Sequence, residues 1–237
     1  MNVTKVFGPP GSGKTTFLLN VVETELDGET SPVQMGYFAF TKKAATEARD
    51  RAIQKFPNLN PDSDFPWFRT LHSLAYRCLG ISTKDMMSPE HYREFAQEAG
   101  IELAVETGEE EFAVRVDNPI LNEINIARIK GLDLHTHYNK SAMTIEWFHF
   151  EYVERAYRQY KEVRSLLDFT DLLEQVLNFP DRLPRLEVLI IDEAQDLSLL
   201  QWRLVEQLAL RAQRCFLAGD DDQAVYTWAG ADVNSFL

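Results

Sequence analysis

The sequence predicts an α/β fold in which helices flank a parallel sheet, with an all-helical subdomain inserted between two parts of the sheet. Apolar, β-branched segments alternate with amphipathic segments in both terminal parts of the chain. A glycine-rich turn follows the first of these apolar segments, and residues 84–165 carry helix signals with few strand signals. We therefore expect one domain built from residues 1–83 and 166–237, interrupted by an insertion of residues 84–165.

The first part of the chain is expected to alternate strands and helices. Residues 3–7 and 36–40 are short apolar runs typical of strands. The predicted helices follow at residues 15–26, 42–55 and 71–79, the last ending at Gly80. The order is therefore that of a parallel sheet with crossover helices.

Capping residues delimit the helices of the insertion. The limits are set by Ser88, Pro89 and Gly100 for one helix and by Asn118, Pro119 and Gly131 for another. We expect a longer helix over residues 144–166 and a solvated acidic loop over residues 102–111.

The last part of the chain returns to the alternating pattern. Asp168 is a candidate cap for a helix through Val176, and Ser198 opens a helix to about residue 212. Residues 186–191 and 215–218 are apolar runs of the kind that form buried parallel strands.

The glycine-rich turn satisfies the phosphate-loop pattern G-x-x-x-x-G-K-S/T in the strand-turn-helix context that this pattern requires. Its glycines let backbone N–H groups converge on phosphate oxygens, Lys14 would neutralise phosphate charge, and Thr15 would offer a hydroxyl to Mg²⁺. A glycine-rich turn with an exposed lysine is the alternative interpretation. The predicted nucleotide-binding residues are Gly8, Pro9, Pro10, Gly11, Ser12, Gly13, Lys14, Thr15 and Thr16.

Two acids, Asp192 and Glu193, directly follow the apolar run 186–191. The end of a parallel strand is where ligands bind in open α/β folds. Asp192 is suited to hold the Mg²⁺ shell and Glu193 to orient and deprotonate an attacking water. Taken alone the pair could be a helix cap, but beside a phosphate loop it predicts catalytic acids.

With both motifs in hand, the sequence resembles the UvrD/Rep-type superfamily-one DNA helicases, a family of P-loop NTPases with RecA-like domains. Several blocks occur in the family's order across almost the whole chain. They are the phosphate loop, AFTKKAA at 39–45, TLHSL at 70–74, DFTDLL at 168–173, DEAQD at 192–196 and GDDDQAVY at 219–226. The resemblance implies that residues 84–165 form a subdomain on the first RecA-like domain.

The resemblance also implies roles for further residues. Gln195 is expected at the nucleotide and Gln223 in the catalytic set beside Lys14, Asp192 and Glu193, with both glutamines near the γ-phosphate. Phe40, Tyr226 and Trp228 are candidates to stack on DNA bases, although each could also be core. Backbone phosphates of DNA would be held by Thr41, Lys42, Thr70, His72 and Ser73.

On this resemblance we expect an ATP- and Mg²⁺-dependent DNA helicase that moves 3′ to 5′ on single-stranded DNA or at a junction with duplex. A second RecA-like domain, in a longer chain or a separate subunit, is expected as a partner that supplies arginine fingers. Hydrolysis by these 237 residues alone is expected to be weak. Only seven residues precede Gly8, so the segment that reads adenine in this family is not recognisable, and Trp228-Ala229-Gly230 stands where an arginine is common.

Composition bounds the class of protein. Two cysteines without a Cys-x-x-Cys pair disfavour a disulfide framework, and no segment approaches the roughly 20 apolar residues of a membrane span, so we expect a cytoplasmic protein without a membrane partner. The net charge of −13 argues against binding nucleic acid by bulk charge. That charge is uneven: 9 Lys and Arg face 8 Asp and Glu in residues 1–83, against 5 and 13 in residues 166–237.

Two other classes of function fit parts of the sequence. A small-molecule phosphotransferase would share the phosphate loop and a helical insertion, but the DEAQD block and the segment around Gln223 disfavour it. A nucleotide-gated binding module that recruits a protein partner through the acidic insertion would show no affinity for DNA.

Overall fold

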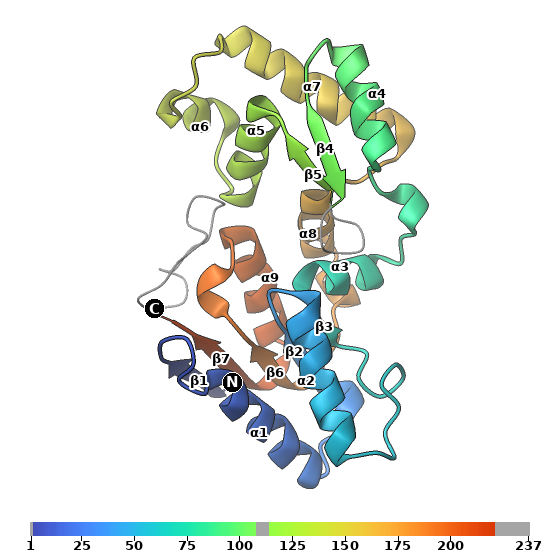
Figure 1. Ribbon diagram of the computed structural model, residues 1–237, viewed down its shortest axis with the longest axis vertical. Helices are drawn as coiled ribbons and strands as arrows, with labels where there is room; N and C mark the ends of the chain where they lie inside the picture. Colours follow the sequence, from blue (N-terminus) through green and yellow to red (C-terminus); the bar gives the residue numbers. More distant parts are fainter. Residues whose placement is uncertain (1, 108–113, 221–237) are drawn as a thin grey trace.

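The chain folds into two lobes in the computed structural model, which describes residues 2–107 and 114–220 (Figure 1). The sheet lobe is formed by residues 2–86 and 167–220, since Met86 and Leu167 pack in its core, and the helical lobe by the described part of residues 87–166. Over the described residues, the sheet lobe holds a five-stranded sheet of order β1-β7-β6-β2-β3, all parallel. Its strands are β1 (Asn2–Phe7), β2 (Met35–Phe38), β3 (Phe68–Arg69), β6 (Leu186–Ile191) and β7 (Ala212–Gly219).

The strand order confirms that two distant parts of the sequence form one sheet. β6 and β7 from the second part lie between β1 and β2 from the first. In the register, Phe7 pairs with Gly219 and Phe38 with Ile191, so these four strands end at the same edge. The loops after β1 and β6, which carry both sequence motifs, therefore leave the sheet side by side.

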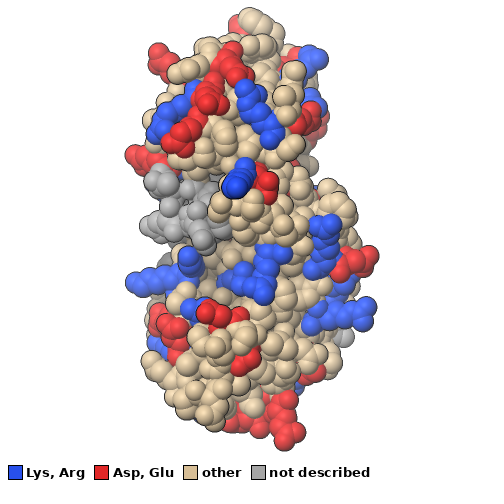
Figure 2. All heavy atoms as spheres, turned by 90° about the vertical axis from the view of Figure 1, so that its right-hand side faces the viewer, with Lys and Arg blue, Asp and Glu red and all other residues tan. Residues whose placement is uncertain are grey.

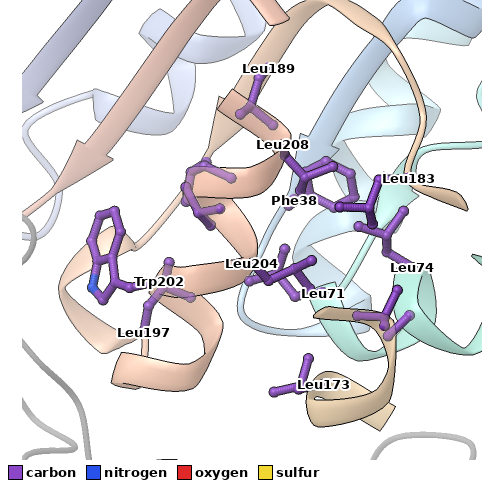
Figure 3. Packing of buried hydrophobic residues seen from close by; sticks show 14 of the residues in the cluster. Phe38, Leu71, Leu74, Leu173, Leu183, Leu189, Leu197, Trp202, Leu204 and Leu208 are labelled. Atoms are coloured by element: carbon purple, nitrogen blue, oxygen red, sulfur yellow. The ribbon is translucent and has the colours of Figure 1, made fainter. Parts of the chain in front are cut away.

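Helices cover both faces of this sheet. Val188 and Ile190 of β6 pack in the cluster that α1 and α2 cover, whereas Leu189 and Ile191 pack in the cluster of α3, α8 and α9 (Figure 3). Both faces of β6 are buried, which explains its continuous run of apolar residues. The helices are α1 (Lys14–Asp27), α2 (Lys42–Lys55), α3 (Leu71–Leu79), α8 (Phe169–Asn178) and α9 (Leu199–Ala209).

The helical lobe has its own core, in which Tyr92, Phe95, Ile124, Phe150 and Val153 are buried together. Its elements are α4 (Pro89–Ala99), β4 (Ala104–Thr107), β5 (Val114–Asp117), α5 (Pro119–Ile129), α6 (Leu134–Lys140) and α7 (Trp147–Arg164). As predicted, Ser88 caps α4 and Asn118 caps α5.

The lobe is not all-helical, and residues 104–107, within the stretch expected to be a solvated loop, form a strand. β4 and β5 form an antiparallel ribbon in which Val105 pairs with Val116 and Glu106 with Arg115. Val105 and Val116 pack on the lobe's core, whereas Glu106 and Arg115 are exposed and of opposite charge. This alternation is that of a half-buried strand, but it is too short to stand out in an acidic stretch.

The chain enters and leaves the helical lobe through two segments that pair with each other. Met86 and Leu167 form a parallel bridge between these crossings. The N–H of Met87 donates to the Leu167 carbonyl at 2.8 Å, and the Leu167 N–H donates to the Asp85 carbonyl at 2.8 Å. The backbone itself therefore joins the two crossings.

Buried charges reinforce this connection. The junction cluster comprises Arg128 of α5, Lys161 of α7 and three acids of α8, Asp168, Asp171 and Glu174. Lys161 Nζ lies 2.5 Å from both Asp168 Oδ2 and Asp171 Oδ2. Arg128 reaches Asp168 Oδ2 at 2.7 Å and Glu174 Oε2 at 2.6 Å, and also pairs with Asp171. Two cations of the helical lobe are thus shared among three acids of the sheet lobe.

Surface charge differs along the molecule. On the face that carries α2 and α3, Lys and Arg gather across the middle, below the helical lobe (Figure 2). None of the helices between residues 2 and 107 or 114 and 220 is long and apolar enough to cross a membrane.

Candidate active site

The predicted phosphate loop joins β1 to α1, and two of its residues, Gly11 and Gly13, have a left-handed backbone conformation that favours glycine. Gly13, which precedes α1, has φ +91°, in the left-handed region that glycine adopts without strain. A Cβ at Gly8 would stand 2.5 Å from Ser12 Oγ. The spacing of the motif therefore follows from the shape of the turn.

Lys14, the first residue of α1, is held inside this loop. Its side chain is buried, and Nζ donates to the carbonyls of Gly8 at 2.5 Å and Pro9 at 3.2 Å. The first N–H groups of a helix have no acceptor within the helix and carry the positive end of its dipole. A phosphate at this loop would thus meet an ammonium group and a helix N-terminus together.

Thr15 and Asp192 are brought together although 177 residues separate them: Thr15 Oγ1 donates to Asp192 Oδ2 at 3.3 Å. Asp192 directly follows β6, is only 3% exposed, and its Oδ1 accepts from the Glu193 N–H at 3.1 Å. Burial raises the pKa of Asp192, and the neighbouring Glu193 charge adds to this, against the hydrogen bond from Tyr37. The hydrogen bond between Thr15 and Asp192 thus joins the phosphate loop to the acidic motif.

Tyr37 of β2 is a site residue that the sequence did not reveal. Its hydroxyl donates to Asp192 Oδ2 at 2.7 Å, and both groups are buried. Burial, followed by the charge of Asp192, raises the pKa of Tyr37, so the phenol remains a donor. A tyrosine in an otherwise apolar strand, Met35–Phe38, was the only available signal.

Glu193 and Gln195 form a second link across the sheet edge. Glu193 has φ +54°, a conformation that strains a residue with a side chain and is frequent at functional sites. Gln195 Nε2 donates to Glu193 Oε2 at 2.8 Å, and Gln195 Oε1 accepts from the Asp220 N–H at 2.9 Å. Gln195 therefore connects the proposed base to the end of β7.

Asp196, the last residue of the DEAQD block, had no role assigned from the sequence, and it completes a group of acids. Burial and the charge of Glu193 raise its pKa to about 6, and its Oδ1 is buried without a hydrogen-bond partner among the residues that the structure describes. In the described part of the chain, neither lysine nor arginine pairs with Asp192, Glu193 or Asp196. This site acid group, Asp192, Glu193 and Asp196, thus keeps negative charge that no side chain there neutralises.

The oxygen donors of Thr15 and Asp192 fit Mg²⁺ better than a softer metal. Within residues 2–107 and 114–220, no three His, Cys, Asp or Glu side chains gather as a metal cage. Mg²⁺ is usually held by one or two protein oxygens together with phosphate oxygens and water, so a two-residue donor set beside a phosphate loop suits it.

Two of the predicted DNA-binding residues, Phe40 and His72, line one cleft of about 310 Å³ between the lobes, together with Phe169. The His72 ring stacks on Phe169 with 3.6 Å between centroids and 15° between planes. Burial lowers the pKa of His72 to about 3, so the ring is neutral. It can donate a hydrogen bond to a phosphate but offers no charge.

The other predicted DNA contacts lie around the starts of α2 and α3. The hydroxyl oxygens of Thr41 and Thr70 cap these helices by accepting from Ala44 N and Ser73 N, each at 3.2 Å. Ser73 Oγ accepts from Arg69, and Lys42 is exposed at the first turn of α2. Gln223, Tyr226 and Trp228 lie outside the described residues, so their predicted roles stay predictions.

Comparison with known proteins gives a family and several relatives. The model of the UvrD/REP helicase N-terminal domain matches residues 2–237. DNA helicase II of Salmonella typhimurium is 30% identical, over 97% of this chain and 33% of that protein. ATP-dependent DNA helicase PcrA of Bacillus subtilis is 29% identical, over 96% of this chain and 32% of that protein. ATP-dependent DNA helicase Rep of Buchnera aphidicola is 28% identical, over 95% of this chain and 34% of that protein. The chain spans about a third of the length of these curated relatives.

Proposed function

This chain belongs to the UvrD/REP helicase N-terminal domain family, and from that membership we propose that it is the ATP-binding motor domain of a DNA helicase. ATP hydrolysis would drive movement along single-stranded DNA, 3′ to 5′, and unwinding of duplex. The observation that carries the proposal is the meeting of Thr15 and Asp192 beside Lys14, since it joins a phosphate loop to a carboxylate at one sheet edge.

In this proposal each site residue has a chemical task. Lys14 and the N–H groups at the start of α1 bind the phosphates, while Thr15 and Asp192 hold Mg²⁺, which when bound offsets phosphate charge. Glu193 orients a water and accepts its proton, and Gln195 holds the Glu193 carboxylate. The loop around Gly8 and Gly13 supplies backbone donors without side-chain obstruction.

The DNA path is proposed to cross the sheet lobe near the starts of α2 and α3. The exposed Lys42 and the hydroxyl of Thr41 suit phosphate oxygens, whereas Phe40 in the cleft suits a base. Glu193 and Gln195 are linked to the end of β7, directly before the segment that contains Gln223. We propose that this segment couples the state of the nucleotide to the DNA path.

Movement along DNA requires two RecA-like domains that close and open around ATP. We therefore propose a second such domain as a partner, in the same or another chain. Its arginine fingers would contribute about 10³–10⁵ in rate.

A nucleotide-binding titration tests the proposal on the chain as it stands. Replacing Lys14 by Ala should weaken binding of a fluorescent ATP analogue in Mg²⁺ by at least about 100-fold, because charge-assisted contacts contribute about 3 kcal/mol. The exposed Lys84, replaced by Ala, is the control and should bind normally. Equal binding by both variants would contradict the proposed site.

A second titration addresses the DNA. Single-stranded oligonucleotide affinity should change when a non-hydrolysable ATP analogue is added. Absence of DNA affinity in either state would favour a module that acts on protein alone, and transfer of phosphate to nucleosides would favour a small-molecule phosphotransferase.

A further inference from the structure

We propose that Tyr37 is a positioning residue of the active site, which orients the Asp192 carboxylate toward the bound cation. The inference rests on the proposed function and extends it to a residue outside the phosphate loop and the acidic motif. It follows from strand register, from the hydrogen bonds of Asp192 and from the surroundings of the tyrosine ring.

The register explains how Tyr37 reaches the site. Tyr37 of β2 is the neighbour of Ile190 in β6, so both side chains lie on the same face of the sheet. Asp192 is two residues beyond Ile190 and therefore projects to that face as well. The phenol spans this two-residue offset, of about 6.6 Å along a strand, and places its hydroxyl 2.7 Å from Asp192 Oδ2.

Three donors define the position of the Asp192 carboxylate. Oδ1 accepts from the Glu193 N–H, whereas Oδ2 accepts from Tyr37 and Thr15. The bond from Thr15 is the longest of the three, at 3.3 Å, and comes from the residue proposed to share the cation. Tyr37 is thus the only side-chain donor to Asp192, among the described residues, that is not itself a proposed cation ligand.

The role of the Tyr37 hydroxyl can be tested separately from the structural role of the Tyr37 ring. The ring stacks on Phe68, with 5.6 Å between centroids and 21° between planes, and belongs to the cluster beneath α1 and α2. A phenylalanine at position 37 would keep these contacts and remove only the donor. Partners that orient a metal ligand typically change metal affinity by 10–100-fold when removed.

The test is a Mg²⁺ titration at pH 7.5 that monitors binding of methylanthraniloyl-ADP to the whole chain. Tyr37→Phe should raise the Mg²⁺ midpoint about tenfold, while the affinity for the same nucleotide in EDTA stays within about twofold. Tyr160→Phe, which removes a hydroxyl that donates to Glu94 at 3.0 Å in the helical lobe, is the matched control and should leave the midpoint unchanged. An unchanged midpoint in Tyr37→Phe overturns the inference.

A double-mutant cycle asks whether Tyr37 acts through Asp192. In the Asp192→Asn background, Tyr37→Phe should shift the midpoint by less than about twofold. A shift as large as that in the wild-type background would mean that Tyr37 acts by another route, and would overturn the inference. Tyr37→Met, another side chain without a hydroxyl that adapts to buried sites, should reproduce the tenfold shift.

The outcome for the proposed function is read separately. If the wild-type chain binds no nucleotide with Mg²⁺ or with EDTA, the proposed function fails. If the wild type binds in a Mg²⁺-dependent manner and Tyr37→Phe behaves identically, only the role of Tyr37 fails.

Discussion

The molecule contains two groups of buried or half-buried acids that differ in their ion-pair partners. In the junction cluster, the acids of α8 meet Arg128 and Lys161 at hydrogen-bond distance. In the site acid group at the end of β6, Asp192, Glu193 and Asp196 have neither lysine nor arginine as an ion-pair partner within residues 2–107 and 114–220. The acids of the junction cluster are therefore paired with cations of the chain, whereas no lysine or arginine of the described residues pairs with the site acid group.

The pKa values of Asp168, Asp192 and Asp196 follow this difference in pairing, but the pKa of Asp171 in the junction cluster does not, because burial and the charge of Asp168 raise it. Burial opposes ionisation of Asp168, but Arg128 and Lys161 outweigh it and hold its pKa well below the ordinary value. Burial raises the pKa of Asp192, and burial with the charge of Glu193 raises that of Asp196. A buried acid paired with cations serves the fold, whereas Asp192, with which no lysine or arginine of the described residues pairs, is suited with Thr15 to receive a cation from solution.

The largest expected effect is on catalysis. Glu193→Gln keeps an oxygen that can accept from Gln195, so the unfolding free energy should change by less than about 0.5 kcal/mol. Loss of the base should slow ATP hydrolysis by the complete helicase about 10³-fold with binding preserved. Single-turnover hydrolysis measures this, and an unchanged rate would remove Glu193 from its assigned role.

The next effect is on stability, at the other cluster. Lys161→Met removes a buried cation from Asp168 and Asp171 and should lower the unfolding free energy by about 3 kcal/mol. Lys55→Met removes an exposed lysine that pairs with Glu23 at 2.9 Å, and should cost less than about 1 kcal/mol. Urea unfolding of both variants measures the two losses of unfolding free energy. Equal losses would show that burial of the junction cluster has no energetic consequence.

Bound Mg²⁺-ADP should stabilise the protein through the site acid group and not through the junction cluster. Mg²⁺ with ADP at 100 times its dissociation constant should raise the unfolding free energy by about 2.7 kcal/mol. The same increment is expected in Lys161→Met, because distant sites contribute additively, and a smaller one in Asp192→Asn. Thermal unfolding with and without Mg²⁺-ADP measures it; a full increment in Asp192→Asn would contradict the assignment of the cation site.

The smallest effect is a difference in pH dependence. Because the pKa of Asp196 is about 6 in the fold against 3.8 normally, its contribution to stability falls as pH rises between these values. Asp196→Asn should therefore raise the unfolding free energy at pH 7.5, by about 1 kcal/mol after allowance for solvent screening.

Asp168 is expected to show the opposite sign. Its pKa is lowered by Arg128 and Lys161 against burial, so its contribution is present above about pH 4 and lost as pH falls. Asp168→Asn should destabilise the protein at pH 7.5. Unfolding at several pH values compares both variants, and equal signs would break the distinction between the clusters.

The parts of the fold that sequence predicted are those specified locally. α2 and α3 occupy the expected residues because Thr41 and Thr70 cap them, and β6 does because its apolar run is bounded by turns. β3 and α6 were missed, since two residues of strand and seven of helix give too little periodicity. The ribbon of β4 and β5 was hidden for the same reason.

For the site, sequence supplied the residues within each motif but not the contacts between distant segments. Thr15 contacts Asp192 at the sheet edge, next to Lys14 in the chain, and the roles predicted for these residues stay predictions. Tyr37 contacts Asp192 across 155 residues, and Arg128 contacts Asp168 across 40. Such pairs depend on strand register and helix packing, which no local pattern in one sequence encodes.

The pairing of Met86 with Leu167 fixes where the helical lobe joins the chain. The bridge is parallel, so both crossings run in the same direction, and a crossover connection rather than a short turn would be needed to close the sheet lobe without the residues between them. The lobe is attached like a side branch whose two ends meet at its base. Its size can therefore change without altering the path of the chain through the sheet, provided that Arg128 and Lys161 still pair with the acids at α8.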